Sequence, residues 1–116
     1  MNYVENIALK SHRKRSGLTQ EDVAILIGAQ SASQVSRHES GEREPDLGTA
    51  IAYRIVLDAP MAHLLPRLFR EIAQKVDERA AKLASQLAQE GGMHQCQRLE
   101  LLRQLAARIA IYHLAL

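Results

Sequence analysis

Glycines that can end helices recur at short intervals in the first part of this 116-residue chain, at Gly17, Gly28 and Gly41. Glycine readily adopts the left-handed conformation that terminates a helix, so each helix before one of these positions has only a few turns. Alanine and leucine are abundant, and no stretch alternates apolar and polar residues for long. The sequence therefore predicts an all-α protein in which five short helices precede two long ones.

Capping residues indicate where the second and third short helices begin. Thr19 can cap the second helix with Asp22 as its reciprocal partner, and Gly28 ends that helix. Ser31 can cap the third helix, with Gln34 completing an S-x-x-Q capping box. Two short helices joined by a tight turn are typical of a helix-turn-helix, whose second helix enters the major groove of DNA. Ordinary packing of short helices is the alternative explanation of this spacing.

The neighbouring helices have their own signals. The first helix is expected from about Tyr3 to Arg15, because basic residues favour a helix C-terminus. Asp46 is expected to cap a fourth helix, and a fifth begins near Met61. The spacing of three and four residues in the fourth helix predicts a core-facing stripe of Leu47, Ala50, Ile51, Arg54 and Ile55.

Two runs of sequence carry a family resemblance. RKRSGLTQEDVA occupies residues 13–24 and is followed by Ile27 and Gly28, and VSRHESGEREP occupies residues 35–45. In this order the motifs resemble the lambda-repressor-like, XRE-type helix-turn-helix family over about residues 3–65. The resemblance implies a five-helix DNA-binding domain, a third helix that reads bases, and binding as a dimer to paired half-sites.

The resemblance also implies roles for single residues. Gln20 matches a family glutamine that contacts a DNA phosphate, although its residue type alone also suits a capping or exposed position. Arg13 and Glu39 match an arginine and a glutamate that pair between the first and third helices. The turn from Gly28 to Val35 is one residue longer than the commonest family spacing, which can displace base contacts by one position. The expected DNA-binding residues are Gln20, Ser31, Ala32, Ser33, Gln34, Ser36, Arg37 and Arg43.

Three residues of the two short helices are expected to contribute to the core. Ala24 is small enough to let the two helices cross closely, and Val35 faces the core from the third helix. His38 stands where the family usually has an apolar side chain. We expect it to be a partly buried, neutral packing histidine and not a pH switch.

Beyond Pro66 the sequence shows apolar periodicity but no family motif. Apolar residues from Leu68 to Leu87 recur at steps of four and three, which predicts a long amphipathic helix, and a second follows Gly91 and Gly92. We expect residues 1–66 to form the DNA-binding domain and residues 67–116 a helical hairpin. The apolar face of its second helix is too broad for the first to cover, which favours dimerisation. The expected dimerisation residues are Leu99, Leu102, Leu105, Ile109, Tyr112 and Leu116.

Other chemistries find little support in the sequence. The single cysteine, Cys96, excludes an intrachain disulfide, and His94 lies too near it in sequence for both side chains to face one metal on a helix. There is no catalytic constellation and no phosphate-binding loop, so we expect no enzyme, no cofactor and no metal. No apolar run approaches the roughly 18 residues of a membrane helix. With no signal pattern at the N-terminus, a cytoplasmic location is expected.

Together these features predict a sequence-specific transcriptional regulator. We expect a repressor that binds double-stranded DNA as a homodimer at a two-fold symmetric operator. One alternative is an antitoxin-like regulator whose C-terminal helices bind a toxin or another protein. A second alternative is a protein-interaction module that has kept the fold without DNA binding, which a gel shift with no salt-dependent binding to any duplex would favour.

Overall fold

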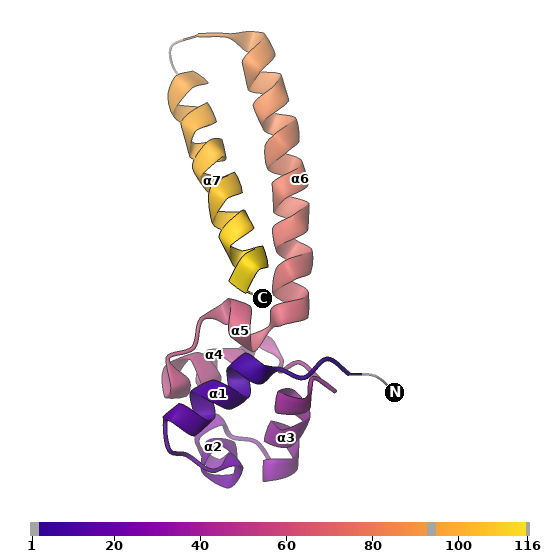
Figure 1. The fold of residues 1–116 in the computed structure, drawn as a ribbon, viewed down its shortest axis with the longest axis vertical. Coiled ribbons are helices and arrows are strands. Elements are labelled where there is room, and N and C mark those ends of the chain that lie inside the picture. The colour runs from indigo at the N-terminus through magenta and orange to yellow at the C-terminus, as the bar shows by residue number, and fades with distance from the viewer. Residues whose placement is uncertain (1–2, 93–94, 116) are drawn as a thin grey trace. The chain divides into compact units, whose positions relative to one another are not determined.

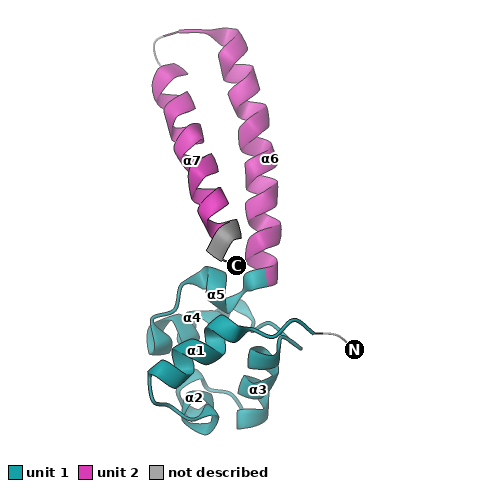
Figure 2. Ribbon diagram, in the orientation of Figure 1, with its two compact units in different colours: residues 1–66 teal, residues 67–116 magenta. Residues whose placement is uncertain are grey.

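The computed structural model describes residues 3–92 and 95–115, and these form helices joined by short turns (Figure 1). The chain divides into two compact units, unit 1 from Met1 to Pro66 and unit 2 from Arg67 to Leu116 (Figure 2). The described residues contain no strand, so the predicted all-α class is confirmed. The helices are α1 (Ile7–Arg15), α2 (Gln20–Ile27), α3 (Ala32–Ser40), α4 (Leu47–Leu57), α5 (Met61–Leu64), α6 (Pro66–Glu90) and α7 (Gln95–Ala115).

Helix α2 begins and ends as the sequence predicts. The Thr19 hydroxyl accepts a hydrogen bond from the backbone amide of Asp22 at 3.0 Å, and the Asp22 carboxylate accepts one from the Thr19 amide at 3.0 Å. Gly28 ends the helix with φ of 76°. Both capping interactions satisfy backbone groups that the first turn of a helix leaves without partners.

The predicted start of α3 is correct in position but wrong in mechanism. Ser31 is the N-terminal capping residue in extended conformation, yet its side chain makes no capping hydrogen bond. The backbone amide of Gln34 donates instead to the Ser31 carbonyl at 3.2 Å. That amide is the donor that the predicted S-x-x-Q box would have used, so the box does not form.

Helix α1 starts four residues later than the predicted Tyr3, because Asn6 caps it. The Asn6 side chain accepts a hydrogen bond from the Leu9 amide at 3.0 Å, and its own backbone amide donates to the Glu39 carbonyl at 2.8 Å. The second bond holds the preceding residues against the end of α3. There Gly41, with φ of 80°, lies so close to the Val4 carbonyl that a side chain would collide with it.

Helix α4 buries only one residue of the predicted stripe. Ala50 is buried together with Tyr53 and Leu57, whereas the other members of the stripe are exposed, namely Leu47, Ile51, Arg54 and Ile55. Apolar spacing failed here because the helix has two apolar faces, and the buried one contains a tyrosine whose hydroxyl finds a partner inside the unit. The core of unit 1 comprises Leu9, Val23, Ala24, Val35, Ala50, Tyr53, Leu57, Ala59, Leu64 and Leu65.

In unit 2, α6 and α7 run side by side in opposite directions (Figure 1). Leu87 and Ile109 are buried, and the rings of Phe69 and Tyr112 meet edge to face at 4.9 Å. Leu68, Ile72 and Leu83 belong to the predicted apolar stripe of α6 but are 40 to 50% exposed. Part of the apolar surface of unit 2 therefore faces outward.

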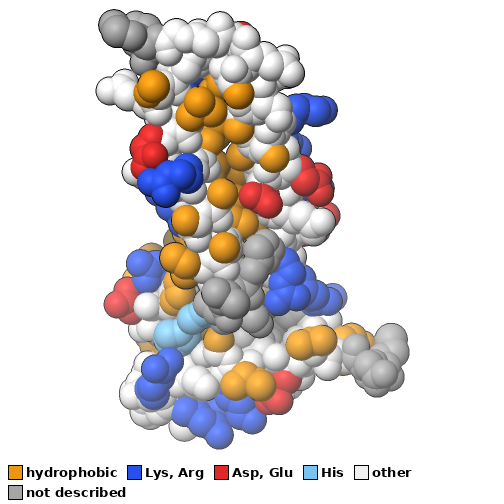
Figure 3. All heavy atoms as spheres, turned by 45° about the horizontal axis from the view of Figure 1, so that its top comes forward, with side chains coloured by type: hydrophobic (Ala, Val, Ile, Leu, Met, Phe, Trp, Pro, Cys, Tyr) orange, Lys and Arg blue, Asp and Glu red, His pale blue; other side chains and the backbone are white. Residues whose placement is uncertain are grey.

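The two helices leave a groove between them, with a cavity of about 250 Å³. Apolar side chains form a band along it, with charged side chains at its sides (Figure 3). Half of the lining residues are alanines, whose small side chains cannot fill the space between two helices. The lining residues are Asp77, Ala80, Ala81, Ala84, Leu99, Leu102, Arg103 and Ala106. No described helix is long and apolar enough to cross a membrane.

Candidate nucleic-acid interface

Helices α2 and α3 form a helix-turn-helix whose second helix presents a polar surface. Ser33, Ser36 and Arg37 on α3 are exposed, whereas Ala32 and Gln34 are half-buried. Val35 on the opposite side of the helix is completely buried and anchors α3 to the core. Ser31 and Arg43, just outside α3, are exposed as well.

An ion pair between α1 and α3 holds the second helix in place. The Arg13 guanidinium donates to both Glu39 carboxylate oxygens, through Nε at 2.6 Å and through Nη2 at 3.0 Å. Its Nη1 donates to the Leu18 carbonyl at 3.0 Å, which adds the turn before α2 to the network. The Arg13 and Glu39 side chains are only 12% and 5% exposed, so water screens their attraction little. Hydrogen bonding with Glu39 raises the pKa of Arg13, which therefore stays charged.

Gln20, the expected phosphate contact, is part of the same network. Its side-chain amide donates to Glu39 Oε1 at 3.2 Å, and the residue is half-buried at the start of α2. Glu39 thus orients Arg13 and Gln20 together. This bond between Gln20 and Glu39 has no signal in the sequence, because it depends on how two helices cross.

His38 is buried behind the recognition surface, as its family position suggests. Its Nδ1 is 2.8 Å from the Tyr53 hydroxyl, and the two rings meet edge to face. Burial, and then the positive charge of Arg43, lowers the pKa of His38. Burial raises the pKa of Tyr53 to a value at which the phenol stays neutral. Neutral His38 is therefore a packing residue that joins α3 to α4.

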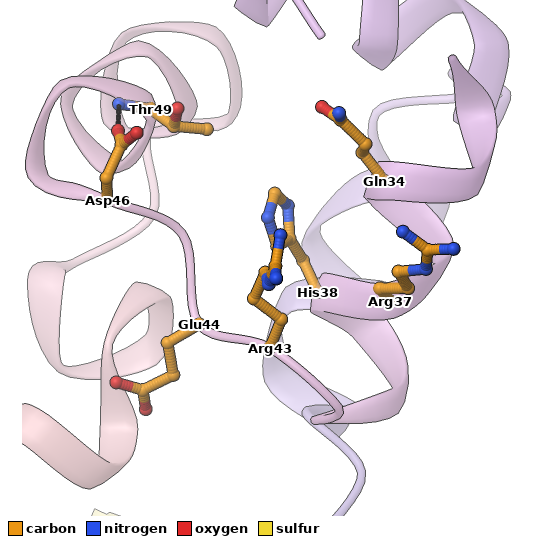
Figure 4. Close-up of a pocket in the computed structure, with 7 residues that line it drawn as sticks. All are labelled: Gln34, Arg37, His38, Arg43, Glu44, Asp46 and Thr49. Carbon is orange, nitrogen blue, oxygen red and sulfur yellow. Dashed lines mark hydrogen bonds between the residues drawn. The ribbon is translucent and has the colours of Figure 1, made fainter. Parts of the chain in front are cut away.

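A hollow of about 390 Å³ lies between α3 and the start of α4 (Figure 4). Gln34 and His38 extend toward it from α3, and it is bordered by Asp46, which precedes α4, and by Thr49 of α4 (Figure 4). Hydrogen bonds from the Thr49 backbone amide and then its hydroxyl lower the pKa of Asp46, so that carboxyl is ionised. The remaining lining residues are Arg37, Arg43 and Glu44.

The hollow therefore has arginines and carboxylates on its rim. Guanidinium groups bind phosphates or guanine edges, and carboxylates accept from the amino group of cytosine. Gln34, Arg37 and Arg43 are predicted site residues, whereas Glu44, Asp46 and Thr49 were not expected at the site. The only sequence signal for these three is their position relative to the G-x-R-x-P motif, because Glu44 lies inside this motif and the other two follow it.

Most of the expected dimerisation residues are partly or fully buried within unit 2. Leu99, Leu102 and Leu105 are half-buried and Ile109 is 4% exposed. Tyr112 packs on Phe69, and Leu116 lies outside the described residues. Among the large apolar side chains described on α7, Leu101 and Ile111 are exposed, at 58% and 64%.

Residues that could hold a metal do not cluster in the part of the chain that the structure describes. No three His, Cys, Asp or Glu side chains there come together as a metal would require. Cys96 is exposed, and His94 lies outside the described residues.

Comparison with protein families agrees with this geometry. Residues 9–64 match a family model described as helix-turn-helix, which spans α2, α3 and the helices that support them. Comparison with curated proteins and with solved structures found no significant match. Residues 9–64 thus form a helix-turn-helix domain of the XRE, lambda-repressor-like type, and this domain supports a role for the protein as a DNA-binding regulator of transcription.

Proposed function

We propose that this protein is a repressor that binds a two-fold symmetric operator as a homodimer, with α3 of each copy in the major groove. The observation that carries the proposal is the exposed polar face of α3, fixed by the buried pair of Arg13 and Glu39. A rigid helix with a free polar face is what base recognition requires, because contacts must form in one register. A dimer bound over a promoter would block access of RNA polymerase and so repress transcription. The proposed location of the protein is the cytoplasm.

The residues divide into two kinds of contact. Gln20 at the start of α2 is proposed to bind a phosphate, where the N-terminus of the helix also favours a negative charge. Gln34 and Arg37 are proposed to reach base edges, since amide and guanidinium groups pair with adenine and guanine. Ser31, Ala32, Ser33, Ser36 and Arg43 complete the proposed surface.

The homodimer is proposed to form through unit 2. Its groove has unfilled space, and alanines and leucines make most of the groove walls. Pairing with the hairpin of a second copy would enclose these surfaces as a four-helix bundle. Leu99, Leu102 and Leu105 would line the new core, while Ile109 and Tyr112 hold α7 against α6.

The test begins with selection of bound duplexes from a random pool, followed by gel shifts at two salt concentrations. Arg37→Ala and Gln34→Ala should each cost about 1 to 3 kcal/mol at one base position and relax the preference there. Gln20→Ala should weaken binding to all duplexes alike. Lys75→Ala on α6, which removes an exposed cation paired with Glu71, is the matched control and should change nothing.

Two outcomes would contradict these assignments. If substitutions at Ala32 or Ser33 change the base preference while those at Gln34 and Arg37 do not, the longer turn has displaced the reading face. If no duplex is bound in a salt-dependent manner, the protein is an interaction module without DNA binding.

The groove of unit 2 also supports the antitoxin-like alternative, because an apolar helix of another protein could fill the same space. Sedimentation of the full chain at tens of micromolar separates the two. A dimer supports repression through paired half-sites. A monomer with an open groove supports docking of another protein.

A further inference from the structure

Helix α4 carries a second apolar face, directed away from the core. Leu47, Ile51 and Ile55 are 64%, 49% and 77% exposed, although they follow one another at intervals of four residues. On an ideal helix Leu47 and Ile55 lie about 40° to either side of Ile51, so the three form one narrow stripe. Three exposed aliphatic side chains in one stripe mark a surface that another apolar surface covers.

Two further residues on this face depart from local preference. Gly48 has an ordinary helical backbone, and the nearest atom to a side chain added there would be an Asp46 carboxylate oxygen at 3.7 Å, an ordinary contact. Glycine weakens a helix, and nothing in unit 1 requires it here. A close approach from outside would require it, because only glycine lets a second helix come near the backbone.

Asp58 is the second departure. It ends α4 with φ of 52°, a left-handed conformation that side chains rarely adopt, and it places a carboxylate at the negative end of the helix dipole. Its partner is Arg54, which donates to the Asp58 carboxylate at 2.7 Å, but the Asp58 side chain is 94% exposed. An exposed ion pair of this kind offsets little of the energetic cost of the left-handed backbone and of the carboxylate at the negative end of the helix dipole.

We propose that this face binds the same face of a second copy, with the two α4 helices antiparallel across a two-fold axis at Ile51. Helix geometry then places Ile51 on Ile51 of the second copy, and Ile55 over Gly48 of the second copy. Asp58 comes beside the first turn of the other α4, where the positive end of the helix dipole favours a carboxylate. The glycine, the left-handed aspartate and the stripe are then explained by one contact.

The small area of this α4 face indicates the condition under which two copies can pair through it. A stable interface covers roughly 800 Å² on each partner, and one face of an eleven-residue helix offers much less. The contact therefore forms between copies of unit 1 that are already held near each other, as in a dimer tethered through unit 2. Tethering raises the effective concentration toward millimolar, at which a small apolar contact is populated.

Cysteine cross-linking in the full chain tests the proposal without DNA. In a Cys96→Ser background, Ile51→Cys should form a disulfide-linked dimer on mild oxidation, because the axis brings the two positions within the roughly 7 Å that a disulfide allows between Cα atoms. Ile25→Cys on α2 is the matched control, since Ile25 is 73% exposed and off this face. The Ile51→Cys protein should cross-link about tenfold faster or more.

A mixture experiment tests the antiparallel register. Leu47→Cys and Ile55→Cys proteins should cross-link with each other faster than either does alone, because the axis at Ile51 places residue 47 of one copy opposite residue 55 of the other. If the Ile51→Cys protein cross-links but the mixture does not, the antiparallel arrangement is wrong. Because no duplex is used, failure of DNA binding would leave this result unaffected.

Two results would overturn the pairing altogether. Equal cross-linking rates for Ile51→Cys and Ile25→Cys, with both thiols reacting quickly with a soluble thiol reagent, mean that the face is free. A slow thiol reaction of Ile51→Cys without cross-linking means that residues of the same chain or another molecule cover it. Far-UV circular dichroism of each variant confirms that the comparison is between folded proteins.

Discussion

Unit 1 and unit 2 are both helical, but the contacts that join the helices within unit 1 differ in kind from those within unit 2. In unit 1 buried polar groups join the helices, with Arg13 and Glu39 linking α1 to α3 and His38 and Tyr53 linking α3 to α4. In the described part of unit 2 the ion pairs lie on the surface, and the residues that line the groove between α6 and α7 are mostly apolar.

This difference has a structural consequence. A hydrogen-bonded pair is satisfied in one geometry only, so unit 1 has a fixed arrangement of helices, as a base-reading surface needs. Apolar faces pack in many ways and leave space, so unit 2 is suited to exchange one apolar neighbour for another. Rigidity and capacity for association are thus separated along the chain.

The largest expected effect is a loss of stability when the polar network of unit 1 is broken at Glu39. Glu39→Ala leaves the Arg13 guanidinium without a carboxylate and removes the acceptor of Gln20, and breaking such a buried pair costs about 3 to 5 kcal/mol. For a domain of this size we expect the melting temperature to fall by roughly 10 °C or more, measured by circular dichroism.

Glu100→Ala on α7 is the control, because Glu100 pairs with Arg103 in the same bidentate manner but on the surface. We expect no clear change there. An unchanged melting temperature for Glu39→Ala would contradict the role given to the buried pair.

The second effect concerns the contribution of unit 2 to DNA binding. A chain that ends at Pro66 should stay folded but become monomeric, because unit 1 has its own core. Its affinity for a selected two-fold symmetric duplex should fall roughly 100-fold, whereas a single half-site should be bound nearly as before. Sedimentation and gel shifts on both proteins measure this. A truncated chain that still dimerises would show that unit 2 is not the tether.

A smaller effect should follow from pH, and it should arise in unit 1. Burial lowers the pKa of His38, and partial burial, followed by the charges of Arg15 and His63, lowers that of His12. The unfolded chain then binds more protons than the folded one as pH falls below the ordinary histidine value of 6.5. Stability is therefore complete above that pH and declines below it, by up to about 1.4 kcal/mol for each pKa unit of lowering.

Thermal unfolding of the protein ending at Pro66, at several pH values between 7.5 and 5, measures this decline. His38→Gln should flatten the profile, because the neutral amide does not titrate. A profile that is equally steep in the variant would assign the decline to other groups.

The smallest expected effect distinguishes two glycines. Gly48→Ala in the chain ending at Pro66 should raise stability by a few tenths to about 1 kcal/mol, since α4 has room for the methyl group. Gly41→Ala should lower stability, because the Val4 carbonyl occupies that space and the backbone is left-handed. A loss of stability at Gly48 would mean that unit 1 itself needs the glycine.

Local signals predicted the elements whose contacts are local. Thr19, Asp22, Gly28 and Asp46 each act on neighbours in sequence, so their capping roles could be inferred directly. Asn6 was missed as a cap, because a single asparagine without a following capping box is a weak signal. The start of α1 was consequently misplaced.

The features that were mispredicted or missed depend on tertiary contacts. The buried face of α4 is selected by Tyr53, whose hydroxyl needs His38 fifteen residues away, and periodicity carries no information about that bond. Residue type alone gave no reason to pair Arg13 with Glu39, so that interaction came from the family motif. The rim residues Glu44, Asp46 and Thr49 also needed the packing of α3 beside α4 before they could be recognised.

Asn6 has one more consequence, which concerns how the chain is made. Its side chain donates to the carbonyl of His63 at 2.8 Å, while its backbone amide reaches Glu39. A ribosome delivers residue 6 first, and the acceptor 57 residues later. The Asn6 cap of α1 therefore has all its hydrogen-bond partners only after α5, which contains His63, has been synthesised. Because that carbonyl precedes the hairpin, the DNA-binding half can finish folding while α6 and α7 are still being synthesised.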